Sequence, residues 1–474
     1  MPGFSDIRQQ LSDKIKTTPP VRVIVVSFAL IILVGTLLLM LPISSKVGGA
    51  SFIDALFTTT SATCVTGLVV GDTYTLWTPF GQGVILGCIQ LGGLGLSTLT
   101  IGFSLLVRRK LGIREMKLAS ESSGGSGLDI AGLLRLTIIF TFACEAIGAC
   151  LLALRFVPMF GVNGIWPSIF CAISAYCNAG FDVLGFVEGN SSMTAFAGDP
   201  LVSLTISFLI IIGGLGFIVV QDIYLCKIQP RFHHKDTIRL NFHSQICLRV
   251  TIGLLIFGTL GFFLLEFSNT MQGLNVLEKL NCAFFQSTNT RTAGFASVDI
   301  ASQFEFTKVL SVLLMFIGAC PGSTGGGIKT TTFTVLAATI VCTIRGKSEA
   351  VILRHRFSTP TVYKAFTLTF VSILLVFIDA GVISSLNPDI LYIDCLYEAT
   401  SAFGTVGLSA SVTPNLDPIS KLILIFTMFV GRVGPLSFGL SILMRHKEKG
   451  ASIYPEGRMI IGSVSYTHLR AHET

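Results

Sequence analysis

Four short segments of the chain share a serine, a stretch of small or polar residues, and a glycine followed by a large apolar residue. They read Ser61-Ala-Thr-Cys-Val-Thr-Gly67-Leu68, Ser174-Ala-Tyr-Cys-Asn-Ala-Gly180-Phe181, Ser287-Thr-Asn-Thr-Arg-Thr-Ala-Gly294-Phe295 and Ser401-Ala-Phe-Gly-Thr-Val-Gly407-Leu408. The glycines are 113, 114 and 113 residues apart, and the third copy has one extra residue before its glycine. A near-constant period with the same motif at each step indicates a fourfold internal repeat.

Glycine suits backbone that turns its carbonyl oxygen toward a central axis, because it adopts positive φ without a steric penalty. Rings of backbone carbonyl oxygens can replace the hydration shell of an ion. Four such turns around one axis would bind a dehydrated cation, and the fourth copy contains Thr-Val-Gly, as potassium-channel filters do. The alternative is four unrelated extracellular turns that happen to contain glycine. The predicted ion-binding residues are Cys64, Val65, Thr66, Gly67, Cys177, Asn178, Ala179, Gly180, Arg291, Thr292, Ala293, Gly294, Gly404, Thr405, Val406 and Gly407.

The same kinds of segment surround each motif. A long apolar run comes first: Val21–Leu41, Ala131–Val157, Cys247–Phe267 and Ala365–Ser385. A shorter segment leads into the motif: Phe52–Thr63, Trp166–Tyr176, Val276–Thr288 and Leu391–Ala402. A second long run follows: Phe80–Val107, Leu201–Cys226, Val309–Ile344 and Ile419–Met444. The long runs have ~20 residues or more and are long enough to cross a bilayer, whereas the shorter segments suit re-entrant helices.

The four loops must lie inside the protein, because non-helical backbone at membrane depth is tolerated only where it is buried or lines a watery cavity. We therefore predict an all-α membrane protein with four tandem helix–pore loop–helix repeats around a pseudo-fourfold central pore. Composition agrees, since 51% of the 474 residues are hydrophobic and 12% are charged, against about 25% charged in soluble domains.

The net charge of +7 is concentrated in basic clusters at 108–117, 227–239, 345–364 and 445–449, with acidic residues between them. The positive-inside rule predicts that the clusters and both termini lie in the cytoplasm. Nucleic-acid binding is the rival interpretation of a basic chain. It is disfavoured because the clusters flank hydrophobic spans and no nucleic-acid-binding motif accompanies them.

At these motifs the chain resembles the membrane subunits of the Trk/Ktr/HKT potassium transporters, and among them the Ktr-type sodium-dependent subunit. The resemblance runs from Thr18-Pro19-Pro20 to Tyr454-Pro455-Glu456-Gly457 and includes Pro321-Gly-Ser-Thr-Gly-Gly-Gly-Ile-Lys329 and Gly431-Arg432-Val433-Gly434-Pro435. In this family, glycine at all four filter positions accompanies potassium selectivity, and serine at the first accompanies sodium permeability. Gly67 therefore implies potassium as the substrate, with sodium as a possible activator and no cofactor bound by the chain.

The run Val309–Ile344 is longer than one span and is interrupted by a segment rich in glycine and proline, which cannot easily continue a helix. Gly322 and Gly327 have the separation of a phosphate-binding loop, but Ile328 intervenes before Lys329, so nucleotide binding is disfavoured. The resemblance implies an intramembrane gating loop below the filter. Its predicted residues are Gly318, Pro321, Gly322, Ser323, Thr324, Gly325, Gly326 and Gly327, with Lys329 and Arg432 beside them.

Three basic residues lie within the spans, where a charge is costly and is usually functional. Two glycine clusters in the spans also need an explanation. We expect Arg432, in the middle of the fourth inner helix, to bind loop carbonyls or to form a positive barrier in the pore. The alternative is a helix-packing ion pair with Glu145, Asp222 or Asp379. Arg291 either shapes the filter entrance or braces its loop, and Lys329 either pairs with inner-helix ends or faces cytoplasmic water. Gly92-Gly93-Leu94-Gly95 and Gly213-Gly214-Leu215-Gly216 predict close helix packing.

These features predict potassium uptake through a carbonyl-lined filter and no enzymatic activity. A carrier with alternating access coupled to sodium or protons is the alternative. An enzyme is disfavoured because His233, His234 and His243 have no matching acidic or cysteine spacing, and no C-x-x-C pair occurs. The resemblance implies a homodimer in the bacterial plasma membrane on a cytoplasmic ring of nucleotide-binding subunits that bind ATP, ADP or NAD.

The predicted boundaries follow from the period. They are a cytoplasmic segment 1–17, repeats 18–117, 118–235, 236–355 and 356–450, and a cytoplasmic segment 451–462. Residues 463–474 resemble nothing upstream in the chain and depart from the family. We expect this tail to be non-native in origin and disordered.

Overall fold

The computed structural model describes residues 20–95, 130–187, 192–228, 239–347 and 349–435. Several predictions fall outside these ranges. They concern the N-terminal segment 1–17, the basic cluster at 108–117, most of the cluster at 227–239, the cluster at 445–449, and residues 451–474. His233 and His234 also lie outside the described residues.

Each repeat begins with a long apolar helix. The four are α2 (Pro20–Leu39), α8 (Ile130–Phe160), α13 (Phe242–Glu266) and α17 (Thr359–Leu386). Their outward faces carry large apolar side chains, and Leu30, Leu264 and Phe370 are 57%, 74% and 69% exposed. Soluble proteins rarely expose contiguous apolar surface of this kind, so lipid is the solvent that these faces fit.

A shorter helix then leads into each motif. These pore helices are α3 (Phe52–Cys64), α9 (Ile165–Cys177), α14 (Val276–Asn289) and α18 (Tyr392–Gly404), and they match the predicted re-entrant segments closely. Ser51 caps α3 by accepting a hydrogen bond from the Asp54 N–H at 3.1 Å, and Asn275 and Glu278 form a capping box at α14. The C-terminal halves of the pore helices are buried.

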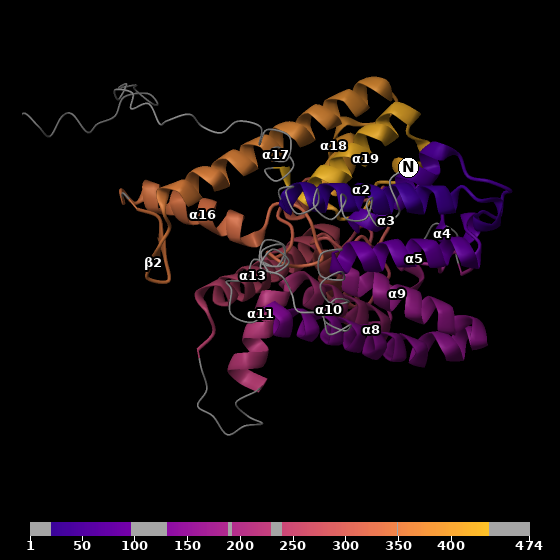
Figure 1. Ribbon diagram of the computed structural model, residues 1–474, viewed down its shortest axis with the longest axis horizontal. Coiled ribbons are helices and arrows are strands. Elements are labelled where there is room, and N and C mark those ends of the chain that lie inside the picture. The colour runs from indigo at the N-terminus through magenta and orange to yellow at the C-terminus, as the bar shows by residue number, and fades with distance from the viewer. Residues whose placement is uncertain (1–19, 96–129, 188–191, 229–238, 348, 436–474) are drawn as a thin grey trace, which may run out of the picture. The chain divides into compact units, whose positions relative to one another are not determined.

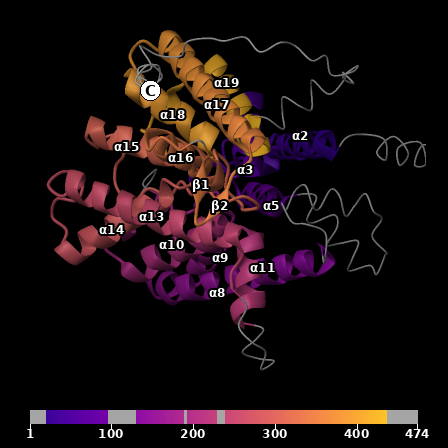
Figure 2. The ribbon, with the colours of Figure 1, turned by 90° about the vertical axis from the view of Figure 1, so that its left-hand side faces the viewer.

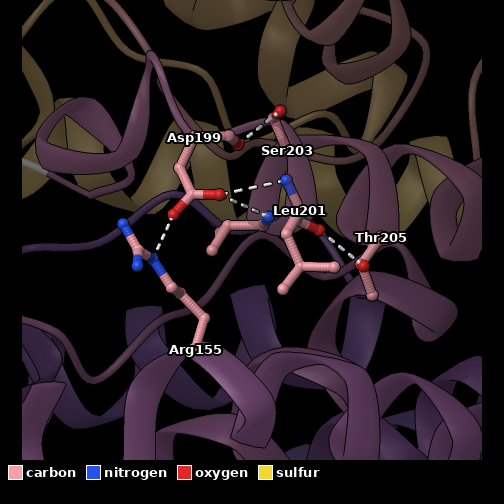
Figure 3. A network of polar contacts seen from close by, with 6 residues as sticks. Arg155, Asp199, Leu201, Ser203 and Thr205 are labelled. Carbon is pink, nitrogen blue, oxygen red and sulfur yellow. Dashed lines mark hydrogen bonds and ion pairs between the residues drawn. The ribbon is translucent and has the colours of Figure 1, made fainter. Parts of the chain in front are cut away.

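The second helices of the repeats are α5 (Pro79–Leu94), α10 (Pro200–Leu215), α15 (Glu305–Phe316) and α19 (Pro418–Val433). Three of them begin with a capping side chain followed by proline, a combination that starts a helix well. Figure 3 shows Asp199 at the start of α10, where its carboxylate accepts from the N–H of Leu201 at 3.0 Å and pairs with Arg155. Fig. 3 also shows the Ser203 and Thr205 hydroxyls bonded to carbonyls of the preceding turn.

The second apolar runs of the first and fourth repeats continue into 96–107 and 436–444, which lie outside the described residues. In the second repeat the run 201–226 does not form one straight span. Among the described residues, four helices are long and apolar enough to cross a membrane, and the bent pair of α10 and α11 (Phe217–Ile223) would make a fifth. The two members of that pair meet at 95°. The second helices end early because α5, α10 and α19 each stop at a glycine with positive φ: Gly95 (75°), Gly216 (87°) and Gly434 (90°).

In the third repeat a loop, 317–329, separates α15 from α16 (Thr330–Ile344). The predicted interruption is therefore confirmed. After α16 the chain forms a small antiparallel hairpin of β1 (Val351–Ile352) and β2 (His355–Arg356), in which Val351 pairs with Arg356.

The packing of the helices closes a ring. Each second helix contacts the pore helix of the following repeat: α5 contacts α9, α10 contacts α14, α15 contacts α18, and α19 returns to α3. Figures 1 and 2 show α8, α9 and α10 side by side, with α17, α18 and α19 grouped in orange and yellow. Since the last repeat packs on the first, the four pore helices surround a common axis, and their C-terminal ends bring the motifs together.

Candidate ion-binding filter and the loop that covers it

The four motif glycines lie in a closed ring. A Cβ added to Gly67 would lie 3.2 Å from the Cα of Gly180, and one on Gly180 would lie 2.9 Å from the Cα of Gly294. One on Gly294 would lie 3.1 Å from the Cα of Gly407, and one on Gly407 would lie 2.8 Å from the Cα of Gly67. Each added Cβ would also overlap a carbonyl oxygen of the next repeat. Four segments from distant parts of the sequence therefore meet backbone to backbone.

The backbone has the same unusual conformation in all four repeats. The glycines have φ values of 96°, 70°, 83° and 93° for Gly67, Gly180, Gly294 and Gly407. Two residues earlier, φ is also positive, at 58° for Val65, 61° for Asn178, 80° for Thr292 and 48° for Thr405. Positive φ is strained for β-branched residues and persists only where surrounding structure imposes it. Its repetition marks a geometry that the whole fold maintains.

Hydrogen bonds from each pore helix fix these turns. The N–H of Thr66 and of Ala179 donate at 2.7 Å to the carbonyls of Ser61 and Ser174, and Val406 N–H donates to Ser401 at 2.9 Å. The hydroxyls of Ser61 and Ser401 accept from the filter glycines Gly67 and Gly407 at 3.1 and 3.0 Å.

In the third copy, Asn289 ties the turn to the pore helix, and its side chain binds the residue after the filter glycine instead of the glycine itself. Its backbone carbonyl accepts from Ala293 N–H at 3.0 Å, and its side chain accepts from Phe295 N–H at 3.1 Å. The extra residue of this motif is therefore absorbed before the ring, which keeps the spacing of the others.

The carbonyl ends of the pore helices adjoin the ring. The last helical residues of α3, α9 and α18 are Cys64, Cys177 and Gly404, the first of the predicted ion-binding residues in their repeats. A helix C-terminus carries roughly −0.5 of an elementary charge, which favours a cation nearby. The structure thus brings the predicted ion-binding residues of all four repeats together, whereas their binding of an ion stays a prediction.

The loop 317–329 lies directly against the filter. The N–H of Gly326 donates to the Thr405 hydroxyl at 2.9 Å. The Asn178 side chain lies between two hydroxyls, 3.1 Å from that of Thr324 and 3.0 Å from that of Thr292. A Cβ added to Gly325 of the loop would lie 2.3 Å from the Thr292 hydroxyl oxygen, so the loop also adjoins the third filter segment. The loop therefore lies against three of the four segments, at the residues that carry the earlier positive φ.

Two basic side chains bind carbonyls of this loop: Arg432 from the fourth repeat, and Lys329 from the loop itself. The Arg432 guanidinium donates to the carbonyl of Thr324 and, at 2.5 Å, to that of Gly92. The Lys329 ammonium donates to the carbonyl of Gly325 at 2.6 Å, which corrects both partners expected for it. Arg432 also lies in the last turn of α19 and not in the middle of a helix. Its expected contact with loop carbonyls is present.

The acidic partners proposed for Arg432 are engaged elsewhere. Glu145 accepts from the Gln90 amide at 3.0 Å, Asp222 accepts from Asn241 N–H at 2.8 Å, and Asp379 accepts from the Thr427 hydroxyl at 2.5 Å. Arg291 is buried, and it donates to the carbonyl of Thr251 on α13 at 3.4 Å. This contact favours bracing of the third filter loop over shaping of its entrance.

The glycine clusters bring backbones close together, as predicted. An added Cβ on Gly92 or Gly213 would overlap the carbonyl oxygen of Thr63 or Tyr176 at the end of a pore helix. The same clusters also end their helices at Gly95 and Gly216, which sequence reasoning missed. The signal was the recurring spacing Gly-x-x-Gly, present again at Gly431 and Gly434.

Comparison with known proteins agrees with this geometry. Residues 7–451 match the sequence profile described as "TrkH: Cation transport protein". The chain belongs to this family. It is 39% identical over 452 residues to the Ktr system potassium uptake protein B of Bacillus subtilis, covering 94% of this chain and 98% of that protein. It is 37% identical over 457 residues to the potassium/sodium uptake protein NtpJ of Enterococcus hirae, covering 94% and 98%.

A solved structure has the same fold. The potassium transporter TrkH from Vibrio parahaemolyticus aligns with a TM-score of 0.68 at 19% identity, covering 90% of this chain and 84% of that one. The predicted fold class and the resemblance to the Trk/Ktr/HKT group are confirmed. As a member of the TrkH family, the chain is a multi-pass membrane transport protein and not an enzyme.

Proposed function

We propose that the chain conducts potassium ions into the cell through the ring formed around Gly67, Gly180, Gly294 and Gly407. The closure of that ring, with the same positive φ in each repeat, carries the proposal. Carbonyls held in rings replace the water around a dehydrated cation. Relatives over almost the whole chain are named for potassium uptake.

The loop 317–329 is the proposed gate. Its hydrogen bonds with Thr405 and Asn178, and the one from Arg432 to the Thr324 carbonyl, support this role. The bond from Lys329 to Gly325 lies within the loop. Deleting Gly325–Gly327 should raise the flux, because the shortened loop no longer reaches these partners. Unchanged flux would count against a gate.

The partners are also part of the proposal. The names of the relatives describe a Ktr system, which supports a regulatory component besides this chain. We propose that the chain is a homodimer in a bacterial plasma membrane, bound to a cytoplasmic ring of nucleotide-binding subunits. Both termini would lie on the cytoplasmic side, with those subunits. Sodium is the proposed activator. The repeat boundaries inferred from the period belong to the same proposal.

The test is rescue of a bacterium that lacks potassium uptake. Cells with the chain should grow at low external potassium and take up rubidium faster when the regulatory partner is present. Absence of growth and of rubidium uptake in correctly inserted protein would contradict the proposal. Single-channel currents would support conduction through an open pore, whereas flux that saturates at low turnover would support the carrier alternative.

A further inference from the structure

One buried carboxylate lies beside the filter without belonging to it. Glu398 is in the pore helix α18, nine residues before Gly407, and its side chain is fully buried. It accepts hydrogen bonds from the Ser409 hydroxyl and, at 2.7 Å, from the Thr413 hydroxyl. The backbone N–H groups of Ala410 and Val412 also donate to it. Burying a carboxylate is costly unless it is paired or hydrogen-bonded, and four donors compensate this one.

All four donors belong to the turn that leaves the filter. Ser409 follows Gly407 by two residues, and the turn contains Ser411 at a positive φ of 64°. On the other side, Gly407 N–H donates to the Ser401 hydroxyl at 3.0 Å. The fourth filter segment is therefore tied to α18 at the filter glycine and again immediately after it.

The other repeats lack this tie. The position nine residues before the filter glycine holds Thr58, Cys171 and Phe285 in the first three repeats. The Thr58 hydroxyl is buried without a hydrogen-bond partner, and the Cys171 thiol interacts with a single backbone N–H, that of Val183. A phenylalanine accepts no hydrogen bond of this kind. Of the four equivalent positions, only the one in the fourth repeat, which carries Thr-Val-Gly, holds a carboxylate, that of Glu398.

A displacement of the fourth segment would spread around the ring. The Gly407 backbone lies against Thr66 and Gly67 of the first repeat, and the Val406 carbonyl lies against Gly294 of the third. Discrimination between two ions of equal charge depends on where the coordinating carbonyls are held and how firmly. We propose that Glu398 is a positioning residue for ion discrimination, which holds the fourth filter segment at the spacing that favours the larger ion. The inference rests on the proposed function.

Replacement by glutamine keeps the shape of the side chain but removes its charge and one acceptor oxygen. The Ser409 and Thr413 hydroxyls can rotate to accept from the new amide, whereas the N–H groups of Ala410 and Val412 cannot. The four hydrogen bonds of the turn lose their charged acceptor, so the turn is held less firmly. Glu398→Gln should therefore move the filter without emptying the space behind it.

Glu266 provides a matched control. It is equally buried, at the end of α13, and accepts from Phe304 N–H at 3.1 Å and from the hydroxyls of Thr307 and Thr270 at 2.5 and 2.8 Å. Its partners are outside the filter motifs. Glu266→Gln therefore carries a comparable cost in buried hydrogen bonds without touching the ring.

The experiment reconstitutes the full chain into liposomes and measures rubidium uptake in competition with potassium and with sodium, alongside thermal stability in detergent. Both glutamine variants should melt earlier than wild type. Of the two, only Glu398→Gln should lose preference for rubidium over sodium, by roughly tenfold. That factor is expected if the energy of one charge-assisted hydrogen bond separates the binding of the two ions. Thr413→Val removes one donor and leaves the carboxylate, so it should shift the preference in the same direction, and less.

The inference is overturned if Glu398→Gln transports with the wild-type preference, or if Glu266→Gln changes the preference equally. If Glu398→Gln does not fold, an unchanged preference in Thr413→Val overturns it. A wild-type chain that shows no preference for rubidium over sodium contradicts the proposed function instead, and the two failures are thereby distinguished.

Discussion

The four filter turns are alike, whereas the ends of the four second helices differ from one repeat to another. The turns have positive φ at the same two positions in every repeat, although the sequences differ at three of four positions. The breaks are unequal: a single glycine ends the second helix in the first, second and fourth repeats, whereas the third has the loop 317–329.

This difference separates two tasks. An ion is spherical, so a site that surrounds it gains from four equivalent contacts, and the ring is kept regular even where the third motif has an extra residue. A gate needs one element that moves against a fixed frame. The loop 317–329 can be that element, whereas in the second repeat a single glycine, Gly216, separates α10 from α11. The loop is held by side chains from the other repeats, including Arg432.

The largest effect is expected when the ring of four filter glycines is itself disturbed. Gly407→Ala places a Cβ on the Thr66 carbonyl oxygen at a φ of 93°, so the fourth turn must leave its position. We expect rubidium uptake to fall by more than about tenfold, the factor that a loss of about 1.4 kcal/mol of ion-binding free energy gives. Gly253→Ala is the control, since an added Cβ there meets nothing within 4 Å. Normal transport by Gly407→Ala would show that the ring is not the conducting site.

The next effect concerns the unequal break. Arg432→Gln shortens the side chain that binds the carbonyls of Thr324 and Gly92, so the loop loses its charged anchor. Flux without the regulatory partner should rise severalfold while the protein remains folded. Arg356→Gln, which removes an exposed ion pair with Glu349, should leave flux unchanged. Equal flux from wild type and Arg432→Gln would show that Arg432 does not hold the loop 317–329 closed.

A smaller effect tests the single-glycine breaks. Gly216→Ala forces a side chain into φ 87° and toward the Pro321 carbonyl, whereas Gly214→Ala meets its nearest atom at 3.6 Å. We expect the first variant to lose about 1–3 kcal/mol of stability, because φ 87° with ψ 147° is a backbone region that essentially only glycine occupies. Thermal aggregation in detergent measures it. If both variants melt together, the break does not depend on glycine.

The smallest effect is expected far from both regions. Arg155→Ala removes the exposed ion pair with Asp199 that Figure 3 shows, yet Asp199 still caps α10. Exposed pairs contribute about 0.2–1 kcal/mol, so stability should fall slightly and transport should be unaffected. A change in rubidium preference in this variant would mean that selectivity is not confined to the ring.

The sequence was informative where geometry follows from local pattern. The start of α3 at Phe52 and of α14 at Val276 was predicted correctly, because short apolar segments with capping residues end at a glycine motif. The meeting of the four glycines followed from their equal period. These features need no knowledge of which side chain contacts which.

The rest depended on tertiary contacts. Hydropathy runs unchanged through Gly95 and Gly216, and a glycine in an apolar run is compatible with either packing or a break, so the breaks were missed. The partner of Lys329 could not be predicted, because a long flexible side chain reaches several carbonyls equally well. The role of Glu398 is visible only when the turn after Gly407 is placed beside α18.

The central claim is that four glycine turns strip water from one potassium ion. Calorimetric titration of the purified chain with potassium and with sodium, repeated on Gly407→Ala, tests it without reference to gating or to partners. The account predicts tighter binding of potassium than of sodium by the wild type, and loss of that difference in the variant. Equal affinities for the two ions in the wild type, or an unchanged preference in Gly407→Ala, would contradict it.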